Sequence, residues 1–377
     1  MATIEQYQTS TGAKRWMVRY RTPDQKQTKK RGFTTKRDAS AFANTVEVSK
    51  MTGAYVAPSA GRATVGDRGG GWLQRQSHLK PSSLRSAEVA WRVHVEPRWS
   101  VVAVGDIERS AVSQWVADLA ARSGPVTVIR AHSVLAQILD EAVADRLITV
   151  NPARGVKLPR KSARARAYLT DGQVWHLARE AGEHNTKVLV LAYCGLRWGE
   201  LAGLHVADVD MLRRRLHVRR NAVNVGGEIV VGTPKTHEQR SVPFPRFLAE
   251  YLARACEGKG RDDIVFANRY GHYAKSPGAN TWFSGAVGRC QAESEDFPRV
   301  TPHDLRHSAA SLAISSGANV KVVQRMLGHK SATMTLDTYA DLFPDDLDSV
   351  ADAHDARVTK CAQNVPTGAD SGLATGL

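Results

Sequence analysis

Residues 301–339 of this 377-residue chain read TPHDLRHSAASLAISSGANVKVVQRMLGHKSATMTLDTY, and the spacing of polar groups in this segment leaves few folds open. His303 precedes Arg306 by three positions at the start of an apolar-periodic segment, so one helix face would carry both side chains. A second short helix is predicted over 320–327, and Gly328 follows it where a helix stop is expected. The segment therefore predicts two consecutive helices that present basic side chains to one site.

Four more polar residues extend this set. His329 follows the glycine stop, and Tyr339 comes ten residues later. Arg197 lies in the string LAYCGLRWGEL, and Lys235 lies in GTPKTHEQRSVP. Cationic and proton-carrying groups of these types are suited to binding a phosphodiester.

In this order, and with these flanking residues, the positions resemble the active-site pattern of the tyrosine recombinase (phage integrase) family. The resemblance covers most of the chain, strongly over residues 165–345 and weakly over the first 150. Each position carries the residue type that the family uses: Arg197, Lys235, His303, Arg306, His329 and Tyr339.

These side chains have the chemistry for cutting a DNA strand by transesterification. Arg197 and Arg306 can each direct two N–H donors at phosphate oxygens, and His329 can add a third donor. Tyr339 is the predicted nucleophile, although a tyrosine among apolar residues could also be a core residue. His303 is placed to accept its proton, because a phenol with an ordinary pKa of about 10 is a poor nucleophile at neutral pH.

The resemblance assigns Lys235 the protonation of the leaving 5′ oxygen, and Glu200 could hold the guanidinium of Arg197. The product would be a 3′-phosphotyrosine and a free 5′-hydroxyl. Because the covalent link retains the phosphodiester energy, we expect no cofactor, no ATP and no metal. His303 and His307 have a spacing that also suits a metal, but no carboxylate or cysteine completes the set, so His307 is interpreted as a packing or DNA-contact residue.

The net charge of +15 favours a polyanionic partner, and its distribution indicates where that partner binds. Residues 1–55 hold 11 Lys or Arg and 4 Asp or Glu, an excess of +7. The four cysteines form no C-x-x-C pair and are typical of free thiols in a reducing compartment. No apolar run approaches the roughly 20 residues of a membrane span. We therefore expect a soluble, cytoplasmic protein that has no membrane partner and lies on the chromosome if the host is bacterial.

The first domain is predicted over residues 1–56, with strands at 4–8, 15–21 and 28–33 and a helix that begins at Thr35. It resembles the small arm-type DNA-binding domain of many phage integrases, and a basic protein-interaction module is the alternative. The side chains expected to contact DNA here are Lys14, Arg15, Arg19, Arg21, Lys26, Lys29, Lys30 and Arg31.

Residues 57–64 are predicted to be a linker, and 65–156 a helical core-type DNA-binding domain. Gly69–Gly71 falls where the family has its first helix, so either the helix starts at Trp72 or this corner is loose. A basic linker follows over 157–166, in which Lys157 and Arg160 are predicted DNA contacts, although such a segment could equally be solvated and idle.

The catalytic domain is predicted over residues 167–358, with helices on both sides of strands at 216–223, 228–231 and 240–242, and residues 359–377 are predicted to be a disordered tail. The acidic segment 341–357 could pack in cis or dock on a neighbouring protomer. The fold class is thus α+β multidomain: a three-stranded sheet with one helix, a helical core-binding domain, and a mostly helical catalytic domain with a small antiparallel sheet.

The resemblance implies a site-specific recombinase that joins the DNA of a mobile element to its host and also excises it. Its partners would be double-stranded DNA with core-type and arm-type sites, three further copies in a homotetramer on DNA, a host DNA-bending protein and an excision factor. Two alternatives are a resolvase or topoisomerase-like strand nicker that uses the same residues, and a DNA-binding protein that has lost catalysis.

Overall fold

The computed structural model describes residues 2–23, 25–53, 55–57, 59–161, 166–234, 239–342, 354, 355 and 358. The chain divides into two compact units, the first made of Met1–Arg164 with Val225–Glu228 and the second of Ala165–Asn224 with Ile229–Leu377. Lys235 and the predicted tail at 359–377 lie outside the described residues, as does most of the acidic segment that follows Tyr339. No helix within the described ranges is both long and apolar enough to cross a bilayer.

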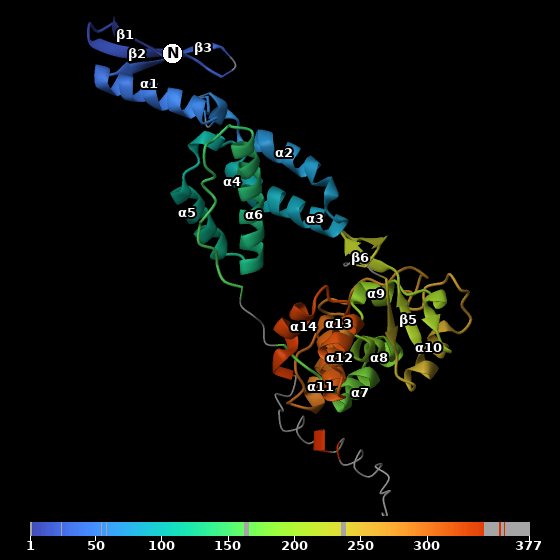
Figure 1. Ribbon diagram of the computed structural model, residues 1–377. Helices are drawn as coiled ribbons and strands as arrows, with labels where there is room; N and C mark the ends of the chain where they lie inside the picture. The colour runs from blue at the N-terminus through green and yellow to red at the C-terminus, as the bar shows by residue number, and fades with distance from the viewer. Residues whose placement is uncertain are drawn as a thin grey trace, which may run out of the picture. The chain divides into compact units, whose positions relative to one another are not determined.

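The first unit begins with an antiparallel sheet of β1 (Thr3–Gln8), β2 (Lys14–Arg21) and β3 (Gln27–Phe33), in the order β1-β2-β3. Helix α1 (Lys36–Met51) packs along one face of this sheet (Figure 1). The hydroxyl of Thr35 accepts from the backbone N–H of Asp38, which caps the helix as the sequence predicts. The side chains that form this small core are Val18, Tyr20, Ala39, Ala43, Val46 and Tyr55.

The register of the sheet separates its basic side chains into two groups. Arg19 pairs with Lys29 and Val18 pairs with Lys30, so the two lysines point to opposite faces. Lys30 faces the helix, and its ammonium lies 4.6 Å from the centroid of the Phe42 ring. By the same alternation Lys14 shares the helix side of β2 with Trp16 and not the open face. The residues that share the open face are Arg15, Arg19, Arg21, Lys29 and Arg31.

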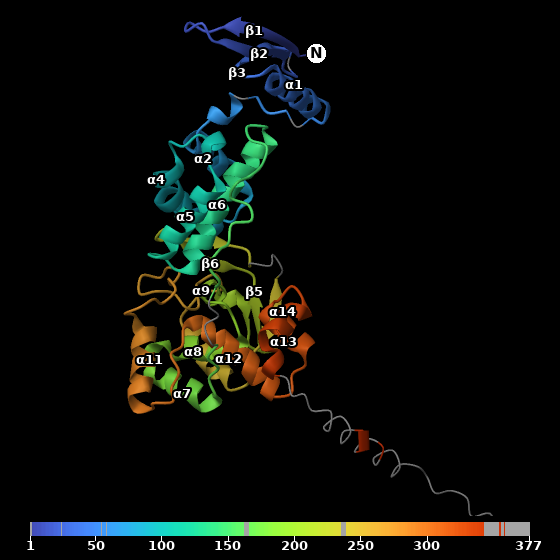
Figure 2. The ribbon, with the colours of Figure 1, turned by 90° about the vertical axis from the view of Figure 1, so that its left-hand side faces the viewer.

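The first unit is mainly helical from residue 65 to residue 144, as predicted. It contains α2 (Val65–Arg75), α3 (Pro81–Ala90), a π-helical turn at Trp91–Val95, α4 (Glu96–Trp99), α5 (Arg109–Ala120) and α6 (Pro125–Ala144) (Figure 2). Its core is rich in tryptophan: Trp72, Trp91, Trp99 and Trp115 are all buried.

The expectation that the first of these helices starts at Trp72 or is loose is wrong, because α2 begins at Val65 and runs through the three glycines. Thr64 and Asp67 form a reciprocal capping box that fixes its start. Gly69 is buried where the indole of Trp91 crosses the helix, and a Cβ there would lie 2.0 Å from an atom of that ring. The packing of Trp91 therefore requires a glycine that helix propensity alone disfavours.

The second unit is mostly helical and contains a small antiparallel sheet. The helices are α7 (Asp171–Glu180), α8 (Asn185–Cys194), α9 (Trp198–Ala202), α10 (Leu248–Cys256), α11 (Trp282–Glu293), α12 (Pro302–Ser315), α13 (Val320–Leu327) and α14 (Ala332–Tyr339). Strands β4 (Val209–Asp210), β5 (Arg215–Val218) and β8 (Arg240–Pro243) form an antiparallel sheet in the order β4-β5-β8. Strands β6 (Asn221–Val225) and β7 (Glu228–Gly232) pair with each other.

The strand predicted over 216–223 is split in two, since β5 ends at Val218 and β6 starts at Asn221. Between them, Arg219 and Arg220 both bind the buried carboxylate of Asp208, at 3.2 and 2.8 Å. Side chains of consecutive strand residues point to opposite faces, so an uninterrupted strand could not direct both to one acid.

We predict that Gly69→Ala destabilises the first unit by up to about 2 kcal/mol, because overpacking costs about 1–3 kcal/mol and alanine returns about 1 kcal/mol of helix propensity. Gly70, its neighbour in α2, is the matched control: it is exposed and a Cβ there meets nothing within 4 Å, so Gly70→Ala should be stabilising. Urea unfolding followed by tryptophan fluorescence measures both. If the two variants shift stability in the same direction, Trp91 does not pack as tightly as described.

Candidate active site

The site forms where α8 and α13 end beside α12, three helices that are neighbours in both views (Figures 1 and 2). Each of the two helices stops at a left-handed glycine, Gly195 and Gly328, both with φ of 64°. A Cβ on Gly195 would lie 2.8 Å from Cδ2 of Leu327, so the close approach also needs glycine. These turns place Arg197 and His329 directly after the two helix ends.

Arg306 of α12 lies between these helix ends and is only 3% exposed. Its two terminal nitrogens donate to the carbonyls of Gly195 and Leu327, each at 2.5 Å. Carbonyls at a helix C-terminus carry partial negative charge, which suits a buried cation. Burial, together with the nearby charge of Arg197, lowers the pKa of Arg306 to about 9, so the guanidinium stays protonated at neutral pH.

Glu200 holds Arg197, as predicted from the sequence, and it also binds an arginine that the sequence did not single out. Nη1 of Arg197 and its backbone N–H both donate to the carboxylate, each at 2.9 Å. Arg240 of β8 donates two hydrogen bonds to the same carboxylate, at 2.9 and 2.6 Å. Burial alone would raise the pKa of Glu200, but hydrogen bonding to Arg240 and the charges of both arginines lower it to about 2.

Tyr339, the predicted nucleophile, is the last residue of α14 and is 1% exposed. Its hydroxyl lies 2.8 Å from Nδ1 of His307, and its ring is nearly parallel to that of His329. Burial raises the pKa of the phenol to about 12, although the charge of Arg306 opposes the shift. At neutral pH the hydroxyl is therefore protonated and directed at a histidine.

His307, which the sequence analysis interpreted as a packing or DNA-contact residue, lies against the hydroxyl of Tyr339. The rings of His303 and His307 lie 5.0 Å apart on α12. Burial, then the charge of His303, lowers the pKa of His307 to about 4, so its imidazole is neutral and can accept a proton at pH 7. Both residues occupy the helix turn that the sequence identified, and only the position of α14 distinguishes them. The role of His303 stays a prediction.

His329 is fixed by its own turn and by α14. Its backbone N–H donates to the carbonyl of Gln324, and the side-chain amide of Gln324 donates back to the carbonyl of His329, each at 3.1 Å. Nδ1 lies 3.0 Å from the hydroxyl of Thr335, which is fully buried. Burial is the main cause that lowers the pKa of His329 to about 4. A neutral ring that accepts from Thr335 carries its proton on Nε2, where it can be donated to a ligand.

The structure thus brings together Arg197, Glu200, Arg306, His329 and Tyr339. Sequence reasoning missed the contacts of Arg240, His307 and Thr335. The only available signals were that Thr335 lies one helix turn before Tyr339 and that Arg240 follows shortly after Lys235.

The predicted DNA contacts of the linker, Lys157 and Arg160, are exposed in the first unit. At the far end of the same linker, Arg166 donates to the carbonyl of Thr338 at 2.8 Å, immediately before Tyr339. The linker therefore ends on the backbone of the helix that carries the tyrosine.

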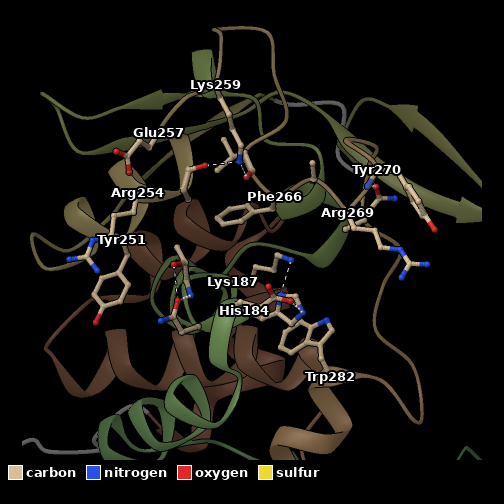
Figure 3. Close-up of a pocket in the computed structure, with 18 of the residues that line it drawn as sticks. His184, Lys187, Tyr251, Arg254, Glu257, Lys259, Phe266, Arg269, Tyr270 and Trp282 are labelled. Atoms are coloured by element: carbon tan, nitrogen blue, oxygen red, sulfur yellow. Dashed lines mark hydrogen bonds and ion pairs between the residues drawn. The ribbon is translucent and has the colours of Figure 1, made fainter.

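A cavity of about 780 Å³ lies elsewhere in the second unit (Figure 3). Its lining includes Lys187, Lys259 and Trp282 but none of the predicted site residues. The ammonium of Lys259 donates to two backbone carbonyls at 2.7 Å, and that of Lys187 lies 3.2 Å from Nδ1 of His184. These contacts occupy N–H donors of the two lysines that would otherwise be available to a ligand in the cavity.

One group of side chains among the described residues has metal-ligand types in reach of one another: His176, Glu180 and Glu293. Arg289 binds Glu180 at 3.0 Å and Arg179 binds Glu293 at 3.2 Å, so a cation would compete with two guanidinium groups. None of the predicted site residues belongs to this group.

Comparison with known proteins places the second unit in a family. Residues 169–345 match the model of the phage integrase family. A putative prophage phiRv2 integrase of Mycobacterium tuberculosis is 28% identical over 341 residues, which cover 85% of this chain and 88% of the relative. The integrase of Mycobacterium phage L5 is 31% identical over 253 residues, which cover 64% and 66% of the two chains.

Solved structures show the same fold at lower sequence identity. The Tn1549 transposon integrase in complex with a circular intermediate DNA has a TM-score of 0.65 at 20% identity, over 78% of this chain and 99% of the other. A lambda integrase tetramer bound to a Holliday junction has a TM-score of 0.57 at 18% identity, over 87% and 96%.

We predict that the stability of the second unit falls as the pH is lowered from about 6.5 to 4. His307 and His329 have folded-state pKa values of about 4, below the ordinary 6.5, so the unfolded chain binds more protons in this window. Urea unfolding at a series of pH values measures the slope, and His307→Asn and His329→Gln should each reduce it. Imidazole NMR signals of these residues that titrate near pH 6.5 would contradict the burial described.

Proposed function

From its membership of the phage integrase family, we propose that this chain is a site-specific tyrosine recombinase that cuts and rejoins DNA at phage and host attachment sites through a 3′-phosphotyrosine intermediate. It catalyses integration of a mobile element, and the same chemistry serves excision. The observation that carries the proposal is that the buried Arg306 and the half-buried Arg197 and His329 lie near one another, with the ring of the buried Tyr339 nearly parallel to that of His329.

Charge stabilisation comes from the two arginines. Arg306 uses one N–H of each terminal nitrogen on a helix carbonyl, and Arg197 uses one on Glu200. A guanidinium has five N–H donors, so both retain donors for the non-bridging oxygens of a phosphate. Nε2 of His329 supplies a further donor to the same oxygens.

The oxygen of Tyr339 attacks phosphorus, the bond to the 5′ oxygen breaks, and the phosphate becomes linked to tyrosine at the 3′ end. The phenolic proton passes to His307, whose neutral Nδ1 lies within hydrogen-bond distance, and His303 is the rival acceptor on the same helix. Lys235 donates a proton to the leaving 5′ oxygen. A 5′-hydroxyl of the second DNA then attacks the phosphotyrosine, which reseals the strand and frees Tyr339 without ATP, metal or cofactor.

The DNA partners follow from the charge of the first unit. The open face of the N-terminal sheet, which carries Arg15, Arg19, Arg21, Lys29 and Arg31, is proposed to bind arm-type sites. The helical region, 65–156, and linker residues Lys157 and Arg160 are proposed to hold core-type sites together with the second unit.

The lambda integrase tetramer on a Holliday junction supports proposing a tetramer on DNA here as well. A host DNA-bending protein and an excision factor are further proposed partners, and the chain would act at the bacterial chromosome in the cytoplasm. A strand nicker would need the same site but not the basic N-terminal sheet. For that reason integration is the preferred function.

Incubation of the protein with supercoiled plasmids that carry random genomic fragments is expected to yield protein joined to DNA 3′ ends, with EDTA present and without ATP. The Tyr339→Phe protein should bind the same DNA and form no adduct. Denaturing gels before and after protease treatment detect the link and identify the cleaved sequence. An adduct formed by Tyr339→Phe would exclude this nucleophile, whereas tight binding without any cleavage at a candidate attachment site would favour an inactive DNA-binding protein.

The identity of the base is tested by comparing His307→Ala with His303→Ala on the cleaved sequence. Loss of a positioned general base typically costs about 100- to 10,000-fold in rate. We expect a loss of this size for His307→Ala, because its Nδ1 contacts the hydroxyl, and a smaller one for His303→Ala. The initial rate of adduct formation between pH 6 and 9 is the measurement. A larger loss of rate for His303→Ala than for His307→Ala would show that His303 accepts the phenolic proton.

A further inference from the structure

Arg240 joins three parts of the active site through one guanidinium group. Its side chain is 9% exposed, and its two terminal nitrogens bind Glu200, whose side chain is fully buried. Its Nε donates to the carbonyl of Met326 at 3.1 Å, in the last turn of α13. Arg240 begins β8, Glu200 lies in α9, and Met326 precedes the turn that holds His329.

The end of α13 is shaped to receive this side chain. A Cβ on Gly328 would lie 3.0 Å from Cδ and 3.1 Å from Nε of Arg240, so the glycine that ends the helix also makes room for the arginine. The left-handed turn and the bound guanidinium therefore depend on each other. A displacement of Arg240 would move the backbone directly before His329.

Arg240 also controls the acid that orients Arg197. Glu200 accepts from both guanidinium groups, and a buried carboxylate that loses one of two cationic partners becomes undercompensated. It would then turn towards Arg197 and take up N–H donors that the phosphate needs. With Arg240 in place, its own donors occupy much of Glu200, and Arg197 keeps a fixed direction.

We propose that Arg240 is a positioning residue of the recombinase site, which aims Arg197 at the scissile phosphate through Glu200 and fixes His329 through the end of α13. The inference rests on the proposed function, since the scissile phosphate is its reference point. Arg240 itself touches protein groups on all three of its nitrogens, so it acts through Arg197 and His329.

The test compares Arg240→Met and Arg240→Lys with the wild-type chain on two substrates. One carries the cleaved sequence with its natural phosphate, and the other carries a methylphosphonate at the scissile position, which removes the negative charge of one non-bridging oxygen. Because the methylphosphonate linkage is neutral, its transition state needs less charge stabilisation from Arg197 and His329. We therefore expect both variants to lose about 10- to 100-fold in cleavage rate on the phosphate, with unchanged DNA affinity, and to lose much less on the methylphosphonate.

Arg213→Met is the matched control, because Arg213 is an exposed arginine of the same unit whose carboxylate partner, Asp210, lies outside the site. It should cleave both substrates like the wild type. Equal losses on phosphate and methylphosphonate for the Arg240 variants would show a general folding defect and overturn the inference, as would no loss on either. Circular dichroism and DNA affinity identify a variant that has not folded. If Arg240→Met has not folded, the comparison of the two substrates is made with Arg240→Lys, which keeps the positive charge.

Guanidinium NMR of the DNA-free protein tests the same inference without cleavage. Rotation of the Arg197 guanidinium should be slower in Arg240→Met than in the wild type, because Glu200 then binds more of its N–H donors, and unchanged rotation would overturn the inference. Wild-type protein that fails to cut any DNA, with Arg197 still held more tightly in Arg240→Met, would refute the proposed function and leave the positioning intact.

Discussion

The rest of the site depends on the buried guanidinium of Arg306, which bridges the C-terminal ends of α8 and α13. A charged group this deeply buried is costly unless oriented dipoles surround it, and the two helix ends supply them. The bridge works only because Gly195 and Gly328 turn the chain away at once. Because Arg197 and His329 follow these two glycine turns, the helix ends that bind Arg306 also place both residues at the site.

The site holds more positive charge than the protein itself neutralises. The charges of Arg197 and Arg240 disfavour protonation of Arg306, and Glu200 favours it. One carboxylate against three guanidinium groups leaves a cationic surplus that a phosphate can meet. Because Glu200 and the helix carbonyls fix the directions of the arginines beforehand, less reorganisation is needed when the charge of the transition state develops.

The sequence predicted those features that depend on neighbours along the chain. Alternation located the N-terminal strands, Thr35 located a cap, and Gly328 located a helix end. The misses involve contacts between distant segments: Trp91 on Gly69, Asp208 with two arginines, and Tyr339 with His307. His303 and His307 lie on one helix turn, and only the placement of α14, set by side-chain packing, distinguishes them. No local pattern contains that information.

The burial of Tyr339 links the chemistry to the position of α14. The phenol packs with Ala310, Ile314, Val323 and Leu327, so a phosphorus atom in solvent cannot reach its oxygen while α14 keeps this packing. The hydrogen bond from Arg166 to the carbonyl of Thr338 joins that helix to the end of the basic linker. An anion that draws Arg166 away removes one restraint on α14 and one of the cations that oppose the raised pKa of Tyr339. An anion along the linker would thus loosen the helix while making the phenol harder to ionise, and for this reason Tyr339, as the proposed nucleophile, would need a neutral histidine within reach in addition to a surrounding positive field.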